Sequence, residues 1–141
     1  MTSGDRRESP AGTTEAATDR PVGSTRWTIP GGDVPVESTG REPAFVSRDE
    51  LCLLNAGDEQ AVAEVTLQYA DGLAAGPYLL TVAPRRVRHV RVNDLIDPFA
   101  PPLGRAYGAI VESTVPIVVQ VGRQDTRRAE NATASTIAYG E

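Results

Sequence analysis

Apolar residues come in short bursts along this chain, and from Trp27 onward Gly, Pro, Asn and Asp separate one burst from the next. A spacing of roughly 8–12 residues is typical of an all-β sandwich or barrel. The alternation is clearest in Ala61–Tyr69, where every second residue is apolar and Glu64, Thr66 and Gln68 lie among the intervening positions. Such alternation predicts a half-buried strand with one face in water. The pattern therefore predicts an all-β protein, a single-domain antiparallel β-sandwich, jelly-roll-like, of about eight strands.

Turn residues divide the other bursts into strands. Three predicted turns, each expected to close a hairpin, are Asn55-Ala56-Gly57-Asp58, Asp71-Gly72 and Pro84-Arg85. Asn55 and Gly57 both tolerate left-handed backbone. The proline-rich range Asp97–Pro102 predicts a rigid connecting loop, because proline lacks the N–H of a central ladder. The remaining predicted elements are strands at Glu50–Leu54, Tyr78–Val82, Val87–Val92, Tyr107–Glu112, Pro116–Val121 and Ser135–Tyr139, and a helix without an apolar stripe around Asp125–Ala132.

The first 23 residues differ in composition from the rest. They contain no Ile, Leu, Phe, Trp or Tyr, and their larger apolar residues are Met1 and Val22. A segment with so little apolar surface cannot offset the entropy lost on ordering. We therefore expect residues 1–23 to be a disordered leader and residues 24–141 to form one domain.

Composition excludes several protein classes. No window approaches the roughly 18 apolar residues of a spanning helix, and the N-terminus lacks the apolar stretch of a signal peptide, so a cytoplasmic location is expected. Cys52 is the lone cysteine and His89 the lone histidine, which excludes an internal disulfide and a zinc finger or ribbon. No cofactor and no metal site is predicted. Cys52 lies in an apolar run and is expected to be a small buried hydrophobe.

A dense positive cluster occupies one predicted strand. It contains Arg85, Arg86, Arg88, His89 and Arg91. Period-2 geometry places arginine on both faces of this strand. One interpretation is an anion or partner site that uses guanidinium forks. The other is an edge strand whose charges prevent sheet-to-sheet aggregation.

Catalytic signals are lacking. No Gly-x-Ser-x-Gly elbow accompanies His89, so a packed or hydrogen-bonded structural histidine is expected, and no enzyme is predicted. All 14 basic residues are arginine and the formal net charge is −5. This charge makes nucleic acid an unlikely partner, since binding would need a local patch repeated across subunits.

A second polar cluster follows the strand Pro116–Val121. Its members are Arg123, Asp125, Arg127, Glu130 and Asn131. Alternating signs at this spacing favour internal ion pairs, in a solvated or subunit-interface segment. The same groups could instead bind a sugar or another polar ligand, with Trp27 as a stacking platform.

Several ordered blocks together resemble the sensory rhodopsin transducer family over about residues 26–139. The blocks are Leu54-Asn55-Ala56-Gly57-Asp58-Glu59, Gly76-Pro77-Tyr78, Leu80-Thr81-Val82, Arg85-Arg86, His89-Val90-Arg91, Asn93-Asp94-Leu95, Asp97-Pro98, Val115-Pro116-Ile117-Val118-Val119-Gln120, Arg123, Asp125, Arg127, Ala129-Glu130-Asn131-Ala132 and Ser135-Thr136-Ile137-Ala138-Tyr139. The resemblance implies a cytoplasmic β-sandwich that assembles as a homotetramer and acts by contacting partners, without known catalysis. It also implies sugar-binding-like behaviour of the fold.

Three functions follow in order of preference. The first is an interaction protein that docks on a sensory rhodopsin or another receptor through the arginine strand. The second is a module for a carbohydrate-like polar ligand, and the third a nucleic-acid-binding regulator. The candidate ligand residues are Trp27, Asn55, His89, Arg91, Arg123, Asp125 and Glu130. Because the chain ends at Glu141, just after the last matching block, fold and assembly are expected to transfer better than the photoreceptor partner.

Overall fold

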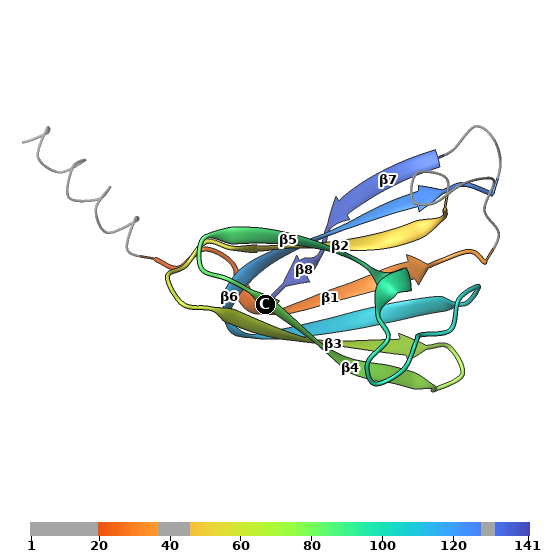
Figure 1. Ribbon diagram of the computed structural model, residues 1–141, viewed down its shortest axis with the longest axis horizontal. Coiled ribbons are helices and arrows are strands. Elements are labelled where there is room, and N and C mark those ends of the chain that lie inside the picture. The colour runs from red at the N-terminus through yellow and green to blue at the C-terminus, as the bar shows by residue number, and fades with distance from the viewer. Residues whose placement is uncertain (1–19, 37–45, 128–131) are drawn as a thin grey trace, which may run out of the picture.

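The computed structural model describes residues 20–36, 46–127 and 132–141, and nearly all of its regular structure is β-strand (Figure 1). The elements are β1 (Ser24–Asp33), β2 (Arg48–Asn55), β3 (Ala61–Tyr69), β4 (Ala74–Val82), β5 (Arg86–Arg91), the 3-10 helix η1 (Val92–Asp94), β6 (Ala106–Asp125), β7 (Ala132–Ile137) and β8 (Tyr139–Gly140). Within the described ranges, no helix has the length and apolarity needed to cross a membrane.

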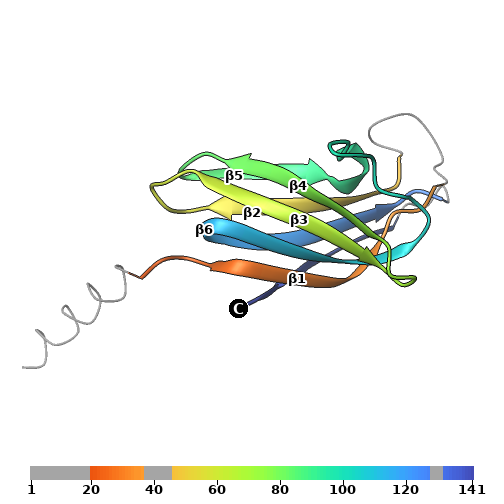
Figure 2. The same ribbon diagram turned by 90° about the horizontal axis from the view of Figure 1, so that it is seen from below.

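The strands form two layers that share β6. The first half of β6 pairs with β1 and β3, which gives the order β4-β3-β6-β1-β8. The second half pairs with β2 and β7, which gives the order β5-β2-β6-β7. All pairings are antiparallel. The predicted antiparallel β-sandwich is confirmed, and Figure 2 shows β5 and β2 behind the layer of β4, β3, β6 and β1.

Strand β6 replaces the two strands predicted at Tyr107–Glu112 and Pro116–Val121. Its ladder with β3 ends at Ser113, and its ladder with β2 begins at Val118. Pro116 lies between these two ladders and has no N–H to donate. The chain therefore changes layers at the proline without leaving the extended conformation.

Two of the three predicted hairpins are wrong. Asp71-Gly72 joins the paired strands β3 and β4, and Gly72 takes the positive φ of 93° that favours glycine. The segments Asn55–Asp58 and Pro84-Arg85 instead carry the chain from one layer to the other, because β2 pairs with β5 and β6 while β4 pairs with β3. The two crossings touch, since the Arg85 N–H donates to the Gly57 carbonyl at 3.1 Å.

Asn55 joins these two crossings from inside the protein. Its side chain is fully buried. Its Nδ2 donates to the carbonyls of Glu59 (2.7 Å), Val82 (3.1 Å) and Ala83 (3.3 Å), and its Oδ1 accepts from the Gly57 N–H at 3.0 Å. The left-handed backbone expected at Asn55 or Gly57 occurs at Arg85 instead, with φ 56°. The expectation that Asn55 contacts a ligand is therefore wrong, because all of its polar atoms serve the fold.

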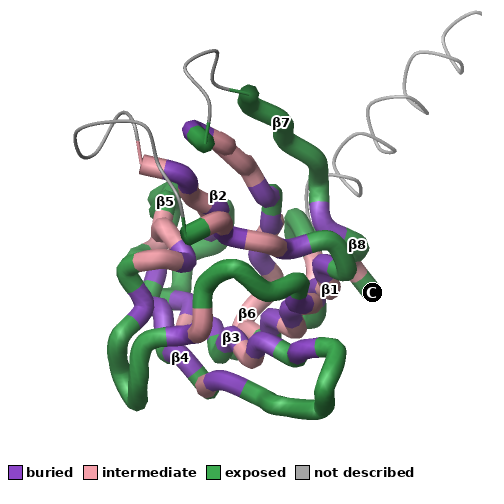
Figure 3. The backbone as a smooth tube through the Cα atoms, turned by 90° about the vertical axis from the view of Figure 1, so that its right-hand side faces the viewer, coloured by how far each residue is buried: buried purple, intermediate pink, exposed green. Residues whose placement is uncertain are grey.

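The core lies between the layers and draws on both. Leu53 of β2, Val65 of β3 and Val119 of β6 are fully buried within one apolar cluster, and Figure 3 shows buried and more exposed positions alternating along β3 and β4. Trp27 is 6% exposed, and its indole N–H donates to the carbonyls of Ser24 and Ile117, both at 3.0 Å. The expected stacking platform at Trp27 is therefore wrong, because the ring belongs to the core.

The loop predicted at Asp97–Pro102 is free of strand, as expected. Two buried tyrosines hold it against the sandwich. The Tyr78 hydroxyl donates to the Phe99 carbonyl at 2.7 Å, and the Tyr69 hydroxyl donates to the Pro102 carbonyl at 3.2 Å. The loop is thereby fixed beside the end of β3 and the middle of β4.

The C-terminal predictions need two corrections. The range Ser135–Tyr139 is divided between β7 and β8 at Ala138, whose buried N–H donates to the Val119 carbonyl at 3.1 Å. The helix expected around Asp125–Ala132 is wrong at both ends, because Asp125 ends β6 and Ala132 begins β7. Residues 128–131 between them, which include Glu130 and Asn131, lie outside the described residues, as do residues 1–19 of the predicted leader.

Replacing Asn55 with alanine is expected to destabilise the protein by about 2–4 kcal/mol, because buried and part-buried carbonyls of both crossings lose their donor. Chemical denaturation monitored by tryptophan fluorescence measures the change. The exposed Gln68 of β3 supplies the control, since Gln68→Ala should change the free energy of unfolding by less than about 0.5 kcal/mol. Equal effects of the two substitutions would contradict the role of Asn55.

Candidate functional site

The arginine strand is an edge strand. In the part of the chain that the structure describes, β5 pairs with β2 on one side and with no strand on the other. Strand β4 forms the corresponding edge of the opposite layer, since it pairs with β3 alone among the described strands. The Arg88 guanidinium spans the gap by donating to the Thr81 carbonyl of β4 at 2.9 Å. Two open edges therefore face each other along one side of the sandwich.

A groove of about 450 Å³, which we call the β4–β5 groove, lies between these edges. The buried Tyr78 and Leu80 contribute to its wall from β4, and Leu95 follows η1. Its charged lining consists of Glu50, Arg88, Arg91, Asp94 and Asp97, and His89 also lines it. The groove therefore combines an apolar base with both signs of charge.

Two arginines of the cluster, Arg85 and Arg91, form ion pairs with other described residues. The Arg91 side chain is the less exposed of the two, with 20% of it accessible. Its Nε lies 3.8 Å from the Asp94 carboxylate, which is an ion-pair distance but too long for a hydrogen bond. Within the described residues this buried Nε has no hydrogen-bond partner. The groove thus contains a cationic donor that the fold leaves unsatisfied.

The other three arginines of the cluster differ in role. Arg85 is a turn residue, and its guanidinium pairs with Asp58 at 2.6 Å. The Arg86 guanidinium donates to the carbonyls of Pro84 and Arg85, and that of Arg88 to Thr81. Neither Arg86 nor Arg88 forms an ion pair with any described residue. These two exposed charges are available to an acidic surface.

The outward side of the β5-β2-β6-β7 layer is partly apolar. The ladders place Val87, Leu54 and Val118 in one row across three strands, and His89, Cys52, Gln120 and Ile137 in the next. Val87 is 58% exposed, Leu54 41% and Ile137 64%. We call Val87, Leu54, Cys52, Val118 and Ile137 the outer apolar face.

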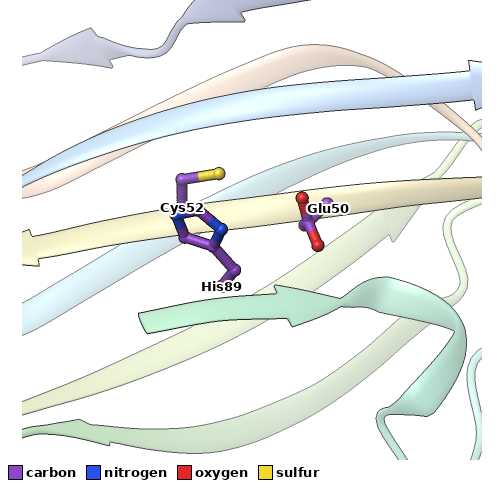
Figure 4. A group of neighbouring side chains, drawn as sticks. All are labelled: Glu50, Cys52 and His89. Atoms are coloured by element: carbon purple, nitrogen blue, oxygen red, sulfur yellow. The ribbon is translucent and has the colours of Figure 1, made fainter. Parts of the chain in front are cut away.

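Cys52 and His89 do not lie where they were expected. Cys52 is half-buried on the outer apolar face and not in the core. Burial, with the neighbouring Glu50 carboxylate, raises the pKa of its thiol, so the thiol is protonated at neutral pH. His89 is exposed, and no described residue forms a hydrogen bond with its ring, so the expected packed or hydrogen-bonded histidine is wrong. Figure 4 shows the His89 ring beside Cys52, with Glu50 further along β2.

Arg123 belongs to a buried polar network that the sequence did not reveal. Asp49 is fully buried and accepts hydrogen bonds from Arg123 Nε (2.8 Å), the Tyr107 hydroxyl (2.6 Å) and the Asp33 N–H (3.0 Å). Burial and the adjacent Asp49 charge raise the pKa of Tyr107 far above its usual value. The hydrogen bond to Asp49 raises the pKa of Arg123 as well. Arg123 also donates to the Gly31 carbonyl at 2.8 Å, so its guanidinium connects β6 to β1 and β2 and is not free for a ligand.

Asp125 and Arg127 form the internal ion pair predicted for the second cluster. The Arg127 guanidinium donates to Asp125 at 2.6 Å and 3.0 Å, and the Arg127 N–H donates at 3.0 Å. These hydrogen bonds lower the pKa of Asp125 from 3.8 to about 2. The proposed ligand set is therefore dispersed, and among its described members only His89 and Arg91 line one groove.

The fold defines the class of this protein as a small antiparallel β-sandwich module with paired open edges. The chain belongs to the family described as Anabaena sensory rhodopsin transducer, which matches residues 22–140. A solved structure titled Anabaena sensory rhodopsin transducer is 46% identical, with a TM-score of 0.66 over 72% of this chain and 98% of that one. The crystal structure of Thermotoga maritima 1070 is 29% identical, with a TM-score of 0.72 over 85% of this chain and 97% of that one. No curated protein gives a significant match.

Replacing Arg127 with glutamine is expected to return the pKa of Asp125 from about 2 toward 3.8, which carbon-detected NMR titration of the carboxyl measures. The folded-state pKa is depressed, so the stabilisation by this pair is complete above the unfolded pKa near 4 and is lost as pH falls through about 2. Arg105→Gln, which removes an exposed arginine that pairs with Asp71, should leave the Asp125 titration unchanged. An unshifted Asp125 pKa in Arg127→Gln would overturn the assignment.

Proposed function

We propose that this protein is a non-enzymatic signalling module of the cytoplasm that assembles as a homotetramer and docks on a receptor, a sensory rhodopsin or a protein in its place. Membership of the transducer family supports the signalling role. The single observation that carries the interaction function is the exposed outer apolar face, on a layer whose edge strand β5 also has two arginines without ion pairs among the described residues.

The outer apolar face is suited to contact between subunits. Val87 and Leu54 are exposed on the adjoining strands β5 and β2, and Ile137 is exposed on β7 of the same layer, on the other side of β6. A large exposed apolar patch on a soluble domain is typical of an interaction site. Copies of one chain meet most simply in closed symmetric assemblies, in which the same patch contacts itself. We assign this face to the contact between copies.

The arginine edge is suited to contact with the receptor. Arg86 and Arg88 lie on β5, where they project to the side opposite Val87 and the outer apolar face, and both are exposed. They form a local positive site on a chain whose net charge is −5. Such a site steers an acidic protein surface toward the edge and fixes its register. A nucleic-acid-binding role has less support, because the rest of the chain would repel the phosphate backbone.

The expected oligomer can be measured by light scattering at micromolar concentration, where the wild-type chain should have the mass of a tetramer. Val87→Glu places a charge on the outer apolar face and should shift the mass toward smaller species. Leu79→Glu changes a similarly exposed apolar residue of β4, outside that face, and should leave the mass unchanged. A monomeric wild-type mass would contradict the proposed assembly.

The double variant Arg86→Gln with Arg88→Gln is expected to keep its stability within about 0.5 kcal/mol, because both positions are exposed. It should lose the receptor that the wild-type chain captures from native lysate after cross-linking. Arg105→Gln, which removes an exposed arginine elsewhere, is the matched control. If the double variant captures the receptor normally but aggregates more readily, the arginines protect a sheet edge and the docking role is wrong.

A polar-ligand function has one specific observation in its favour, the unsatisfied Arg91 Nε in the β4–β5 groove. A ligand hydroxyl or carboxylate in the groove would accept from the Arg91 guanidinium, which is 20% accessible. Calorimetric titration with neutral and acidic sugars tests this function. Binding should disappear in Arg91→Gln and persist in Arg26→Gln, whose arginine pairs with Glu141 elsewhere. Absence of heat with every sugar class would remove this candidate.

A further inference from the structure

Three side chains with different metal-binding atoms meet on the outer side of β2 and β5. Cys52 and His89 are directly opposite in the ladder, so both point to the same face, and Glu50 follows on that face two residues along β2. The Cys52 sulfur, the His89 ring nitrogen and a Glu50 oxygen all lie within 4.8 Å of one another (Figure 4). Neither the signalling role nor the polar groove accounts for this grouping.

We propose that Glu50, Cys52 and His89 bind a divalent transition-metal ion, for which Zn²⁺ is the best match. Zn²⁺ accepts thiolate, imidazole and carboxylate ligands together. The thiolate and the carboxylate neutralise its two positive charges, with the thiol proton released to solvent on binding. Ca²⁺ and Mg²⁺ prefer oxygen ligands and would leave the cysteine and histidine unused.

The three ligand atoms must move closer together to bind one ion. Zn–ligand bonds of about 2.0–2.3 Å in tetrahedral geometry place neighbouring ligand atoms roughly 3.4–3.7 Å apart. The three atoms, which lie within 4.8 Å of one another, therefore need to approach by roughly 1.4 Å at most. Half-buried Glu50 and Cys52 lie on β2, which is paired on both sides. His89 is exposed on the edge strand and can turn toward them at little cost.

Three protein ligands leave one position of a tetrahedral ion open. Glu50 and His89 line the β4–β5 groove, whereas Cys52 and His89 line a smaller hollow on the outer apolar face. A bound ion would lie between the two, and its open position would accept water or an exogenous ligand. Counting cysteine and histidine excludes the closed four-ligand sites of zinc fingers, but it does not exclude this mixed open site.

Cobalt is the probe that tests the site. The full-length chain, prepared without a histidine tag and stripped with chelator, is titrated with Co²⁺ and then with Zn²⁺ as competitor. We expect one Co²⁺ per chain, with thiolate-to-metal charge-transfer absorption and the strong visible bands of tetrahedral cobalt. Zn²⁺ should abolish both. Because the chain has one histidine, the imidazole NMR signals give an independent readout of binding at His89.

Variants separate this site from adventitious binding. Cys52→Ser should abolish the charge-transfer band, and His89→Gln and Glu50→Gln should each weaken affinity by more than about tenfold. Glu64→Gln removes an exposed carboxylate of β3 and should leave the titration unchanged. Melting curves of the stripped proteins confirm that each variant is folded. Absence of the band in the wild-type chain, or its persistence in Cys52→Ser, would overturn the proposal, whatever the oligomeric state.

Discussion

Every strand among the described residues is hydrogen-bonded to β6 directly or through one neighbour. This follows from one constraint, the passage of a single long strand from one layer into the other at Pro116. Pro116, which has no N–H to donate, lies between the end of the β3 ladder at Ser113 and the start of the β2 ladder at Val118. Because β6 pairs in both layers, it connects them covalently, and the apolar core lies between the two layers.

The candidate functional surfaces lie at and near the strand edges that remain unpaired in the two layers. Since β6 occupies the middle of both layers, β4 and β5 become edges on the same side and enclose a groove. Asn55 keeps those edges in place by joining the crossings that lead to β3 and β5. The arginines of β5, the outer apolar face and the Glu50–Cys52–His89 group all involve β5 or its partner β2. The proposed receptor contact, polar-ligand site and metal site therefore share these two strands.

Residue type alone did not distinguish the polar and aromatic side chains that can contact a ligand from those that the fold uses internally. Trp27, Asn55 and Arg123 have the chemistry of ligand contacts, yet the fold uses all three internally. The alternation of inward and outward positions along β2 could have identified some of these buried polar residues. Asp49 and Asn55 share the inward side with Leu51 and Leu53, and a polar residue on an inward side needs a buried partner. The identity of that partner, Arg123 in one case and backbone carbonyls in the other, depends on distant segments.

The sequence by itself determined the all-β class, most strand positions, the proline-rich loop and the family, because alternation and turn residues act over a few neighbouring positions. It also located the positive strand and the Asp125–Arg127 pair, whose partners are two residues apart. The tertiary structure alone decided which turns are hairpins and which are layer crossings, since local turn chemistry is the same in both. It also placed Cys52 outside the core and His89 beside it, because strand pairing brings together residues 37 positions apart only after the sheet has formed.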